Sequence, residues 1–257
     1  MSGISFEHPY RIRYFETAAN QELTITSLMR YFEELALFQS EDRGVGFDYY
    51  HRHQVIWMLH QYDIRMHRMP RFGEKVLLRT LPVSIYRFMG FRRFWVLDGQ
   101  GKELVSADSS WLFVNTATRR PMRVNEDMKR AYGHLDKPES RLVMDEIAAL
   151  ERVDHDREFQ VRQSDIDVNR HVNHVQYVDW ALEALPPELS EKYGLRRLRV
   201  DFKKETVYGM RIRTMAGIHE TETGLHGRHS ITGDDGQEKS SLYTEWVLNK
   251  GHEAQPG

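Results

Sequence analysis

The sequence of 257 residues contains no cysteine. This absence excludes disulfides, thiolate metal ligands and cysteine nucleophiles. The sequence also has no apolar run long enough to cross a membrane, and its first residues, MSGISFEHPYRIRYFE, contain no apolar signal region. We therefore expect a cytoplasmic protein with no membrane partner.

An excess of charge of one sign is also missing, because the formal net charge is −2. No overall field favours nucleic acid, and an acidic partner would need a local basic surface. The hydrophobic share of 40% and the charged share of 29% are typical of a globular protein. The length allows one large domain or two of ordinary size.

The sequence contains two related halves. A comparison without gaps places RIRYFETAANQELTITSLMRYFEELA, from Arg11, over QVRQSDIDVNRHVNHVQYVDWALEAL, from Gln160. Two further matches follow in the same order, MPRFG with ETVYG and DGQGKELVSADSSWLFVN with DDGQEKSSLYTEWVLN. Each match is weak alone, but three in one order indicate two copies of a single unit.

Each copy is predicted to open with a short extended segment and to continue into a helix. Apolar residues at helical spacing predict these helices near Leu23–Gln39 and from Val175 to Leu185. Side-chain caps are available for both helices, from Asn20 or Thr24 and from Asn169 or Asn173. Alternating patterns and turn residues then predict strands at Val55–His67, Lys75–Val83, Gly90–Leu97, Glu103–Val114, Leu195–Lys203, Arg211–Glu220, Gly224–Thr232 and Ser240–Leu248.

A long helix followed by an antiparallel sheet belongs to the α+β class. A sheet wrapped round one helix is the hot dog fold, so two tandem copies predict a double hot dog. We assign residues 1–125 to the first copy, 126–155 to a partly helical linker that crosses the surface, and 156–250 to the second copy. Residues 251–257 are expected to form a disordered tail.

The densest polar cluster is SDIDVNRHVNHVQYVDW, at the expected start of the second helix. Asp167, Asn169 and His171 alternate there, so an extended turn would point them to one side. Unpaired backbone NH groups at the helix start could hold a developing oxyanion. A carboxylate, an amide and an imidazole together could activate water or polarise a carbonyl group.

Two plainer interpretations compete with a catalytic one. Asp167 and Asn169 could simply cap the helix while His171 packs in the core. The first copy keeps Asn20 but lacks the acid and the histidine, and a cap needs only one such group. A metal site at His171 and His174 is also possible from their spacing, but no HExxH motif is present and the 13 histidines make chance pairs common.

A second acid is a candidate for the same chemistry. Glu205, in VDFKKETVYG, aligns with Met69 of the first copy. The copy that carries chemistry would need the carboxylate, and the other copy would tolerate methionine. Alternatively, Glu205 is an exposed glutamate balanced by Lys203 and Lys204, and the pattern leaves both interpretations open.

The sequence resembles the acyl-acyl carrier protein thioesterases, the plant plastid enzymes and their bacterial relatives. The most specific piece is DIDVNRHVNHVQYVDWALE, where the family reads close to DLDVNQHVNNVKYIGWILE, and the resemblance runs from about Tyr10 to Leu248. It implies a double hot dog that hydrolyses the thioester between a fatty acyl chain and the phosphopantetheine arm of a carrier protein. The products are free fatty acid and holo carrier protein, which ends chain elongation.

The resemblance also implies roles for individual residues. The family's Asp-x-Asn-x-His falls on Asp167, Asn169 and His171, which would polarise the thioester, and its downstream acid falls on Glu205, which would act as base on water. The plant enzymes carry cysteine after that acid, whereas this chain has Thr206. A threonine hydroxyl with no evident base is a poor nucleophile, so we expect water to attack. The first copy is expected to form the acyl-chain pocket, the second to carry the catalytic residues, and neither a cofactor nor a metal is expected.

Two other functions remain open, a hot dog thioesterase acting on acyl-CoA and a non-catalytic acyl-binding lipid sensor. The partner implied by the resemblance is an acyl carrier protein, which is acidic beside its phosphopantetheine serine; no nucleic acid is expected, and the chain is expected to be a monomer or homodimer. Two basic clusters could bind that carrier, Arg196, Arg197, Arg199, Lys203 and Lys204, or Arg119, Arg120 and Arg123. The first cluster is favoured because the carrier must deliver a short arm to Glu205.

Overall fold

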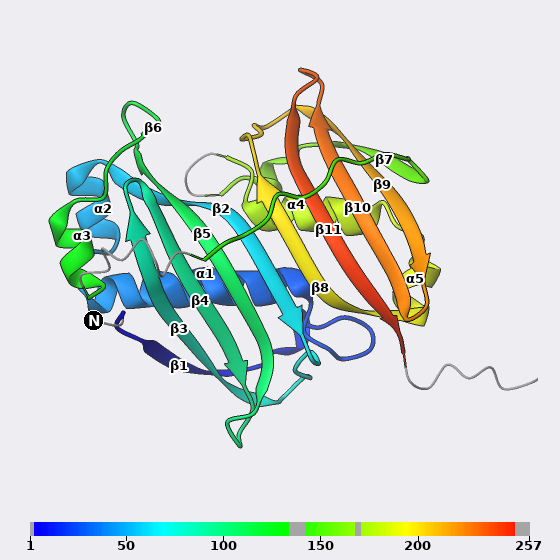
Figure 1. Cartoon of the computed structure of the whole chain (residues 1–257), viewed down its shortest axis with the longest axis horizontal. Helices are drawn as coiled ribbons and strands as arrows, with labels where there is room; N and C mark the ends of the chain where they lie inside the picture. Colours follow the sequence, from blue (N-terminus) through cyan, green and yellow to red (C-terminus); the bar gives the residue numbers. More distant parts are fainter. Residues whose placement is uncertain (1–2, 134–141, 168–170, 250–257) are drawn as a thin grey trace, which may run out of the picture. The chain divides into compact units, whose positions relative to one another are not determined.

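The computed structural model describes residues 3–133, 142–167 and 171–249 (Figure 1). It divides into two compact units, Met1–Met144 and Asp145–Gly257, which we describe separately. This division falls inside the segment 126–155 that the sequence assigns to a linker. Residues 134–141 of that segment and the tail 251–257 lie outside the described residues.

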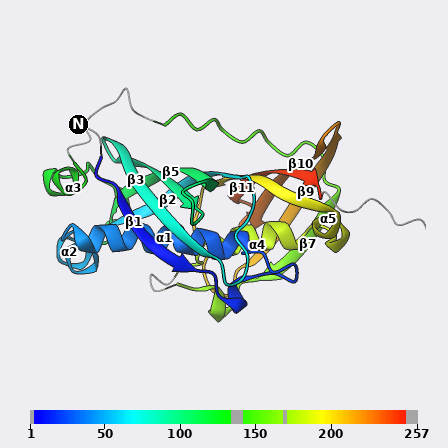
Figure 2. The ribbon, with the colours of Figure 1, turned by 90° about the horizontal axis from the view of Figure 1, so that it is seen from below.

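The first unit is an antiparallel sheet with a long helix on one face. The strands follow the order β1-β3-β4-β5-β2, and β6 pairs with β5. Their bounds are β1 (Phe6–Arg11), β2 (Val55–Met66), β3 (Lys75–Tyr86), β4 (Met89–Leu97), β5 (Glu103–Asn115) and β6 (Arg120–Pro121). The helices are η1 (Tyr14–Glu16), α1 (Ile25–Asp42), α2 (Phe47–His53) and α3 (Glu126–Ala131). The long helix α1 packs against β1 and β3 (Figure 2).

The second unit repeats this plan. Its antiparallel strands follow the order β8-β11-β10-β9-β7, and the helix α4 packs against β9, β10 and β11 (Figure 1). The strand bounds are β7 (His155–Gln160), β8 (Tyr193–Phe202), β9 (Arg211–Thr221), β10 (Gly224–Gly233) and β11 (Glu238–Leu248). The helices are η3 (Gln163–Asp165), α4 (His174–Glu183) and α5 (Pro187–Lys192).

The apolar spacing in the sequence accounts for the face that each helix buries. In α1, Leu28, Phe32 and Leu35 are completely buried, and in α4 Val175 and Val178 are equally buried. Residues three to four positions apart lie on one side of a helix, so these side chains form a single apolar stripe against the sheet. Burying one such side chain contributes about 1.5–3 kcal/mol to stability.

Side-chain caps set where the two helices begin. The hydroxyl of Thr24 accepts a hydrogen bond from the backbone NH of Ser27, so α1 starts at Ile25 and not at the predicted Leu23. The side chain of Asn173 performs the same role for α4. Of the caps that the sequence offers, the later one in each copy is therefore used.

Among its described residues, the segment between the two copies contains one helix. That helix is α3, at the start of the segment. Residues 142–151 of the predicted linker form neither helix nor strand. Asp154 then fixes the chain beside β9, since its carboxylate accepts a hydrogen bond from the backbone NH of Ile218 at 2.9 Å.

Among the described residues, no helix combines the length and the apolar character that crossing a membrane requires.

Candidate active site

The polar segment singled out in the sequence lies between η3 and α4, and its described ends are held together. Ile166 and Val172 pair at its base, and the backbone NH of Asp167 donates to the carbonyl oxygen of His171 at 2.8 Å. The backbone NH of His171 in turn lies 3.3 Å from Oδ1 of Asp167. The loop thus holds the first and last of the three predicted residues beside each other. Asn169, at the middle of the motif, lies outside the described residues.

Glu205 reaches the same place from the chain segment that follows β8. Its Oε2 lies 3.7 Å from Nε2 of His171, and the two side chains are 34% and 23% exposed. This distance is longer than a direct hydrogen bond but within ion-pair range when the imidazole is protonated. The backbone NH of Val172 donates to the carbonyl oxygen of Thr206 at 3.1 Å and ties the two segments together.

The lysines before Glu205 have other partners. Nζ of Lys203 lies 2.5 Å from a carboxylate oxygen of Glu238, and Lys204 donates to the side chain of Gln237. These contacts weaken the interpretation of Glu205 as a surface acid balanced by its neighbouring lysines. The geometry instead brings Glu205 to His171.

Thr206 is completely buried and already hydrogen-bonded. The hydroxyl of Tyr177, on α4, donates to Oγ1 of Thr206 at 2.8 Å and lies 3.5 Å from the carbonyl oxygen of Lys204. Burial raises the pKa of Tyr177 to about 12, so its phenol remains a neutral donor at physiological pH. A buried hydroxyl held in this way is poorly placed to attack a substrate.

The first unit has the same backbone hydrogen bonds, which we call the backbone frame, but not the side chains of Asp167, His171 and Glu205. There the NH of Ala18 donates to the carbonyl oxygen of Glu22 at 2.9 Å, and the NH of Leu23 donates to that of Pro70 at 2.8 Å. Thr17 and Leu23 form the matching bridge at the base of the loop. These contacts support the alignment of the two copies residue by residue.

The two loops therefore differ in their side chains and not in their backbone hydrogen bonds. The first unit places Ala18, Glu22 and Met69 where the second has Asp167, His171 and Glu205. It also has Leu28 and Pro70 at the positions of Tyr177 and Thr206, so it lacks that buried hydrogen bond. Tyr177 is not among the site residues predicted from the sequence, although its alignment with Leu28 marks it as a polar group particular to the second copy.

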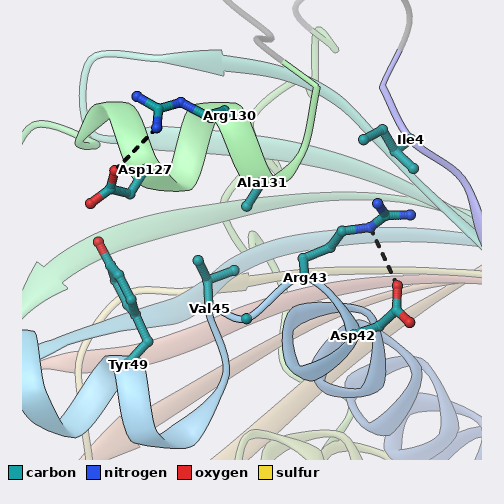
Figure 3. Close-up of a pocket in the computed structure, with 9 residues that line it drawn as sticks. Ile4, Asp42, Arg43, Val45, Tyr49, Asp127, Arg130 and Ala131 are labelled. Carbon is teal, nitrogen blue, oxygen red and sulfur yellow. Dashed lines mark ion pairs between the residues drawn. The ribbon is translucent and has the colours of Figure 1, made fainter.

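A separate hollow of about 470 Å³ opens on the first unit (Figure 3). Its charged side chains pair locally, with Arg43 Nε 3.4 Å from a carboxylate oxygen of Asp42 and an Arg130 nitrogen 4.0 Å from one of Asp127. None of the predicted site residues lines this hollow. Its polar, charge-balanced wall is unlike the apolar pocket expected for an acyl chain.

The described part of the chain contains no group of three or more His, Asp or Glu residues arranged to hold a metal ion. His171 lies beside Asp167, through its backbone NH, and beside Glu205, through its imidazole. A base, an imidazole and a second carboxylate at the start of a helix can remove a proton from water and stabilise a developing negative charge.

Protein-family models match both units of the chain. Residues 3–132 match the model of the acyl-ACP thioesterase N-terminal domain, and residues 149–248 match that of the C-terminal domain. The acyl-[acyl-carrier-protein] hydrolase FATB2 of Cuphea viscosissima is 24% identical over 260 residues, which is 95% of this chain and 63% of that protein. Oleoyl-acyl carrier protein thioesterase 2 of Arabidopsis thaliana is 26% identical over 79% of this chain and 60% of that protein. The chain thus spans somewhat less than two thirds of the length of these relatives.

Solved structures confirm the predicted double hot dog. A putative oleoyl thioesterase from Lactobacillus plantarum superposes with a TM-score of 0.87 at 25% identity and covers 96% of this chain and 97% of that one. The 12:0-ACP thioesterase from Umbellularia californica gives a TM-score of 0.81 at 20% identity, with coverage of 97% and 99%. Because the two domain models together match most of the chain, the protein belongs to the acyl-ACP thioesterase family.

Proposed function

We propose that the protein hydrolyses the thioester of fatty acyl-acyl carrier protein in the cytoplasm, releasing free fatty acid and holo carrier protein. Membership of the family and the names of the relatives support this substrate. The observation that carries the proposal is the meeting of His171 with Glu205 and Asp167 in the second unit. The same backbone frame in the first unit lacks these side chains.

In the proposed mechanism, Glu205 takes a proton from a water molecule, and the resulting hydroxide attacks the thioester carbonyl carbon. The carbonyl oxygen becomes negatively charged, and His171, with Asn169, stabilises it. The carbon–sulfur bond then breaks, and the proton held by Glu205 passes to the sulfur of the leaving phosphopantetheine thiol. The partial exposure of both side chains allows water to reach the carboxylate of Glu205.

Asp167 acts in this mechanism by orienting the loop. Its carboxylate accepts from the backbone NH of His171, which keeps the histidine directed toward Glu205. We retain the division of labour expected from the sequence, with residues 1–125 forming the acyl-chain pocket and 156–250 carrying the catalytic residues.

The test is turnover of purified protein on an acyl-carrier thioester and on the acyl-CoA of the same chain, with free fatty acid and free thiol measured together. Preferred release from the carrier supports the proposal. Preference for acyl-CoA would favour the other thioesterase, and binding without release would favour a lipid sensor. Glu205→Gln, which should be nearly inactive, and Glu222→Gln, at an exposed turn, form a matched pair that excludes a contaminating hydrolase.

A further inference from the structure

A group of arginines gathers at one end of the sheet of the first unit. Arg87 and Phe88 form the two-residue turn between β3 and β4, and β6 runs beside β5 just beyond that end (Figure 1). The backbone NH of Val124 donates to the carbonyl oxygen of Arg87 at 2.8 Å, which places the two segments side by side. The exposed members of this group that the argument uses, which we call the arginine group, are Arg87, Arg120 and Arg123.

The arginine group is not offset by acids of its own segments. Residues 86–89 and 115–125 contain no aspartate or glutamate. The acids that follow are matched by other cations, because Glu126 pairs with Lys129 at 2.9 Å and Asp127 with Arg130 at 4.0 Å. For Arg120 and Arg123, the described residues provide no ion pair. The surface therefore carries a local positive charge on a protein whose net charge is −2.

The basic cluster favoured by the sequence, which precedes Glu205, differs because several of its members have acidic or carbonyl partners. Arg197 lies 3.2 Å from Glu245, Lys203 lies 2.5 Å from Glu238, and Arg199 donates to the carbonyl oxygen of Asp145. These side chains are engaged within their own unit, so they offer less free charge to a partner. The structure thus shifts the expected binding surface away from the residues that precede Glu205.

The duplicated fold provides an internal control. The turn between β9 and β10 corresponds to the turn between β3 and β4, since Thr221 pairs with Gly224 as Tyr86 pairs with Met89. Where the first unit has Arg87 at this turn, the second has the exposed acid Glu222. A basic turn is therefore not a requirement of the fold, and its charge is available for recognition.

We propose that the arginine group is the surface that binds the acidic carrier protein. This inference rests on the proposed function, because it assigns the partner of that reaction to a surface. Arginine forms bidentate, charge-assisted hydrogen bonds with carboxylates, which suits a partner helix rich in Asp and Glu. Charged groups at the rim of such an interface chiefly change the association rate and its salt dependence.

The test uses Arg120→Glu/Arg123→Glu, which leaves untouched Arg87, the member of the group with positive φ. The control is Arg11→Glu/Lys75→Glu, which makes the same change in net charge on exposed residues at the other end of β3. We expect the first variant to raise KM for the acyl-carrier thioester by about tenfold while kcat falls less than about twofold, and the control to change neither as much. Hydrolysis of an uncharged acyl-pantetheine mimic should be unchanged in both.

Salt gives a second readout. Raising ionic strength from about 50 mM to about 300 mM should raise the wild-type KM toward that of the variant, because screening weakens the attraction that the variant has already lost. Equal KM values for wild type and variant, or an equal rise in the control, would refute the binding surface while leaving the enzyme assignment intact. Failure of the wild type to hydrolyse both the carrier substrate and the mimic would instead refute the proposed function.

Discussion

Glu205 is the residue on which the proposed chemistry depends most directly. Replacement by alanine removes the base, and we expect kcat to fall by about a hundredfold or more, the usual scale for a lost general base. The side chain is 34% exposed, so the free energy of unfolding should change little. Single-turnover release of fatty acid, measured beside a denaturant unfolding curve, checks both. Turnover near that of wild type in the folded variant would remove Glu205 from the mechanism.

Tyr177 is expected to act through the backbone that carries Glu205. Its hydroxyl binds Thr206 on one side of that residue and lies near the carbonyl oxygen of Lys204 on the other. Tyr177→Phe should lower kcat by about three- to tenfold with little change in KM, and should cost about 1 kcal/mol of stability, the usual worth of one hydrogen bond. Tyr208→Phe, at an exposed position, is the control.

A double-mutant cycle separates positioning from general destabilisation. If Tyr177 acts through Thr206, then Tyr177→Phe/Thr206→Val should be no slower than Tyr177→Phe alone, because the shared hydrogen bond is lost only once. Thr206→Val by itself should lower kcat by about the same three- to tenfold, because it removes the same hydrogen bond, and by no more, since water is the nucleophile. Additive losses in kcat, or an acyl ester trapped on Thr206, would contradict this role.

For individual residues, the sequence indicates the site chiefly through differences between its two copies. Asp167, His171 and Glu205 stand out because Ala18, Glu22 and Met69 replace them in an otherwise matching frame. The approach of His171 to Glu205 could not be predicted in this way, because it depends on contacts between segments more than thirty residues apart. For the same reason the sequence does not predict the partners of Lys203 and Lys204. These partners, which the structure shows, determine whether the two ammonium groups are available to another protein.

The strands were predictable from strand-forming residues between turn signals, and in β9 the side chains also alternate between exposed and buried positions from Arg211 to Thr214. β2, for example, spans Val55–Met66 where the pattern predicts Val55–His67, and β9 spans Arg211–Thr221 where it predicts Arg211–Glu220. Short helices lack enough turns to show a period, so α2, α3 and α5 escaped prediction. The start of α2 depends instead on a tertiary contact, the hydrogen bond from the NH of Phe47 to Oε1 of Glu41 at 2.7 Å.

Strand β10 carries a buried histidine that should make stability depend on pH. His229 is 2% exposed, its Nε2 lies 3.1 Å from Oγ1 of Thr244, and burial lowers its pKa to about 4. In the unfolded chain the pKa is about 6.5, so the unfolded state binds the proton first as pH falls. Stability is therefore fully present above about pH 6.5 and declines toward pH 4, with about 2 kcal/mol lost by pH 5.

Urea unfolding at several values of pH, for the wild type and His229→Gln, measures this contribution. The variant has no imidazole to protonate at this position, so its free energy of unfolding should fall by about 2 kcal/mol less between pH 7.5 and pH 5. Both proteins share their carboxylates, and the difference between the two curves isolates the histidine. Parallel curves would show that His229 carries the same charge in the folded and the unfolded state, which would contradict the prediction.

The activity of the protein should not change on treatment with reagents that inactivate thiol enzymes. It has no cysteine, so prolonged treatment with iodoacetamide or N-ethylmaleimide should leave kcat unchanged. Dialysis against a strong chelator should also preserve activity, because the mechanism assigns His171 to hydrogen bonding. Assays before and after each treatment, with a thiol protease and a zinc peptidase treated alongside, check these outcomes. Recovery of activity only on adding back a metal would contradict the second expectation.

The backbone hydrogen bonds shared by the two units have a consequence for which substitutions the chain can accept during evolution. Gly73 and Gly209 occupy the same left-handed conformation, with φ of 79° and 81°, and their NH groups donate to the carbonyl oxygens of Ile12 and Val161. A loop that keeps its backbone bonds can exchange its side chains at little structural risk. After duplication, one half could therefore lose its reactive groups by single substitutions without unfolding.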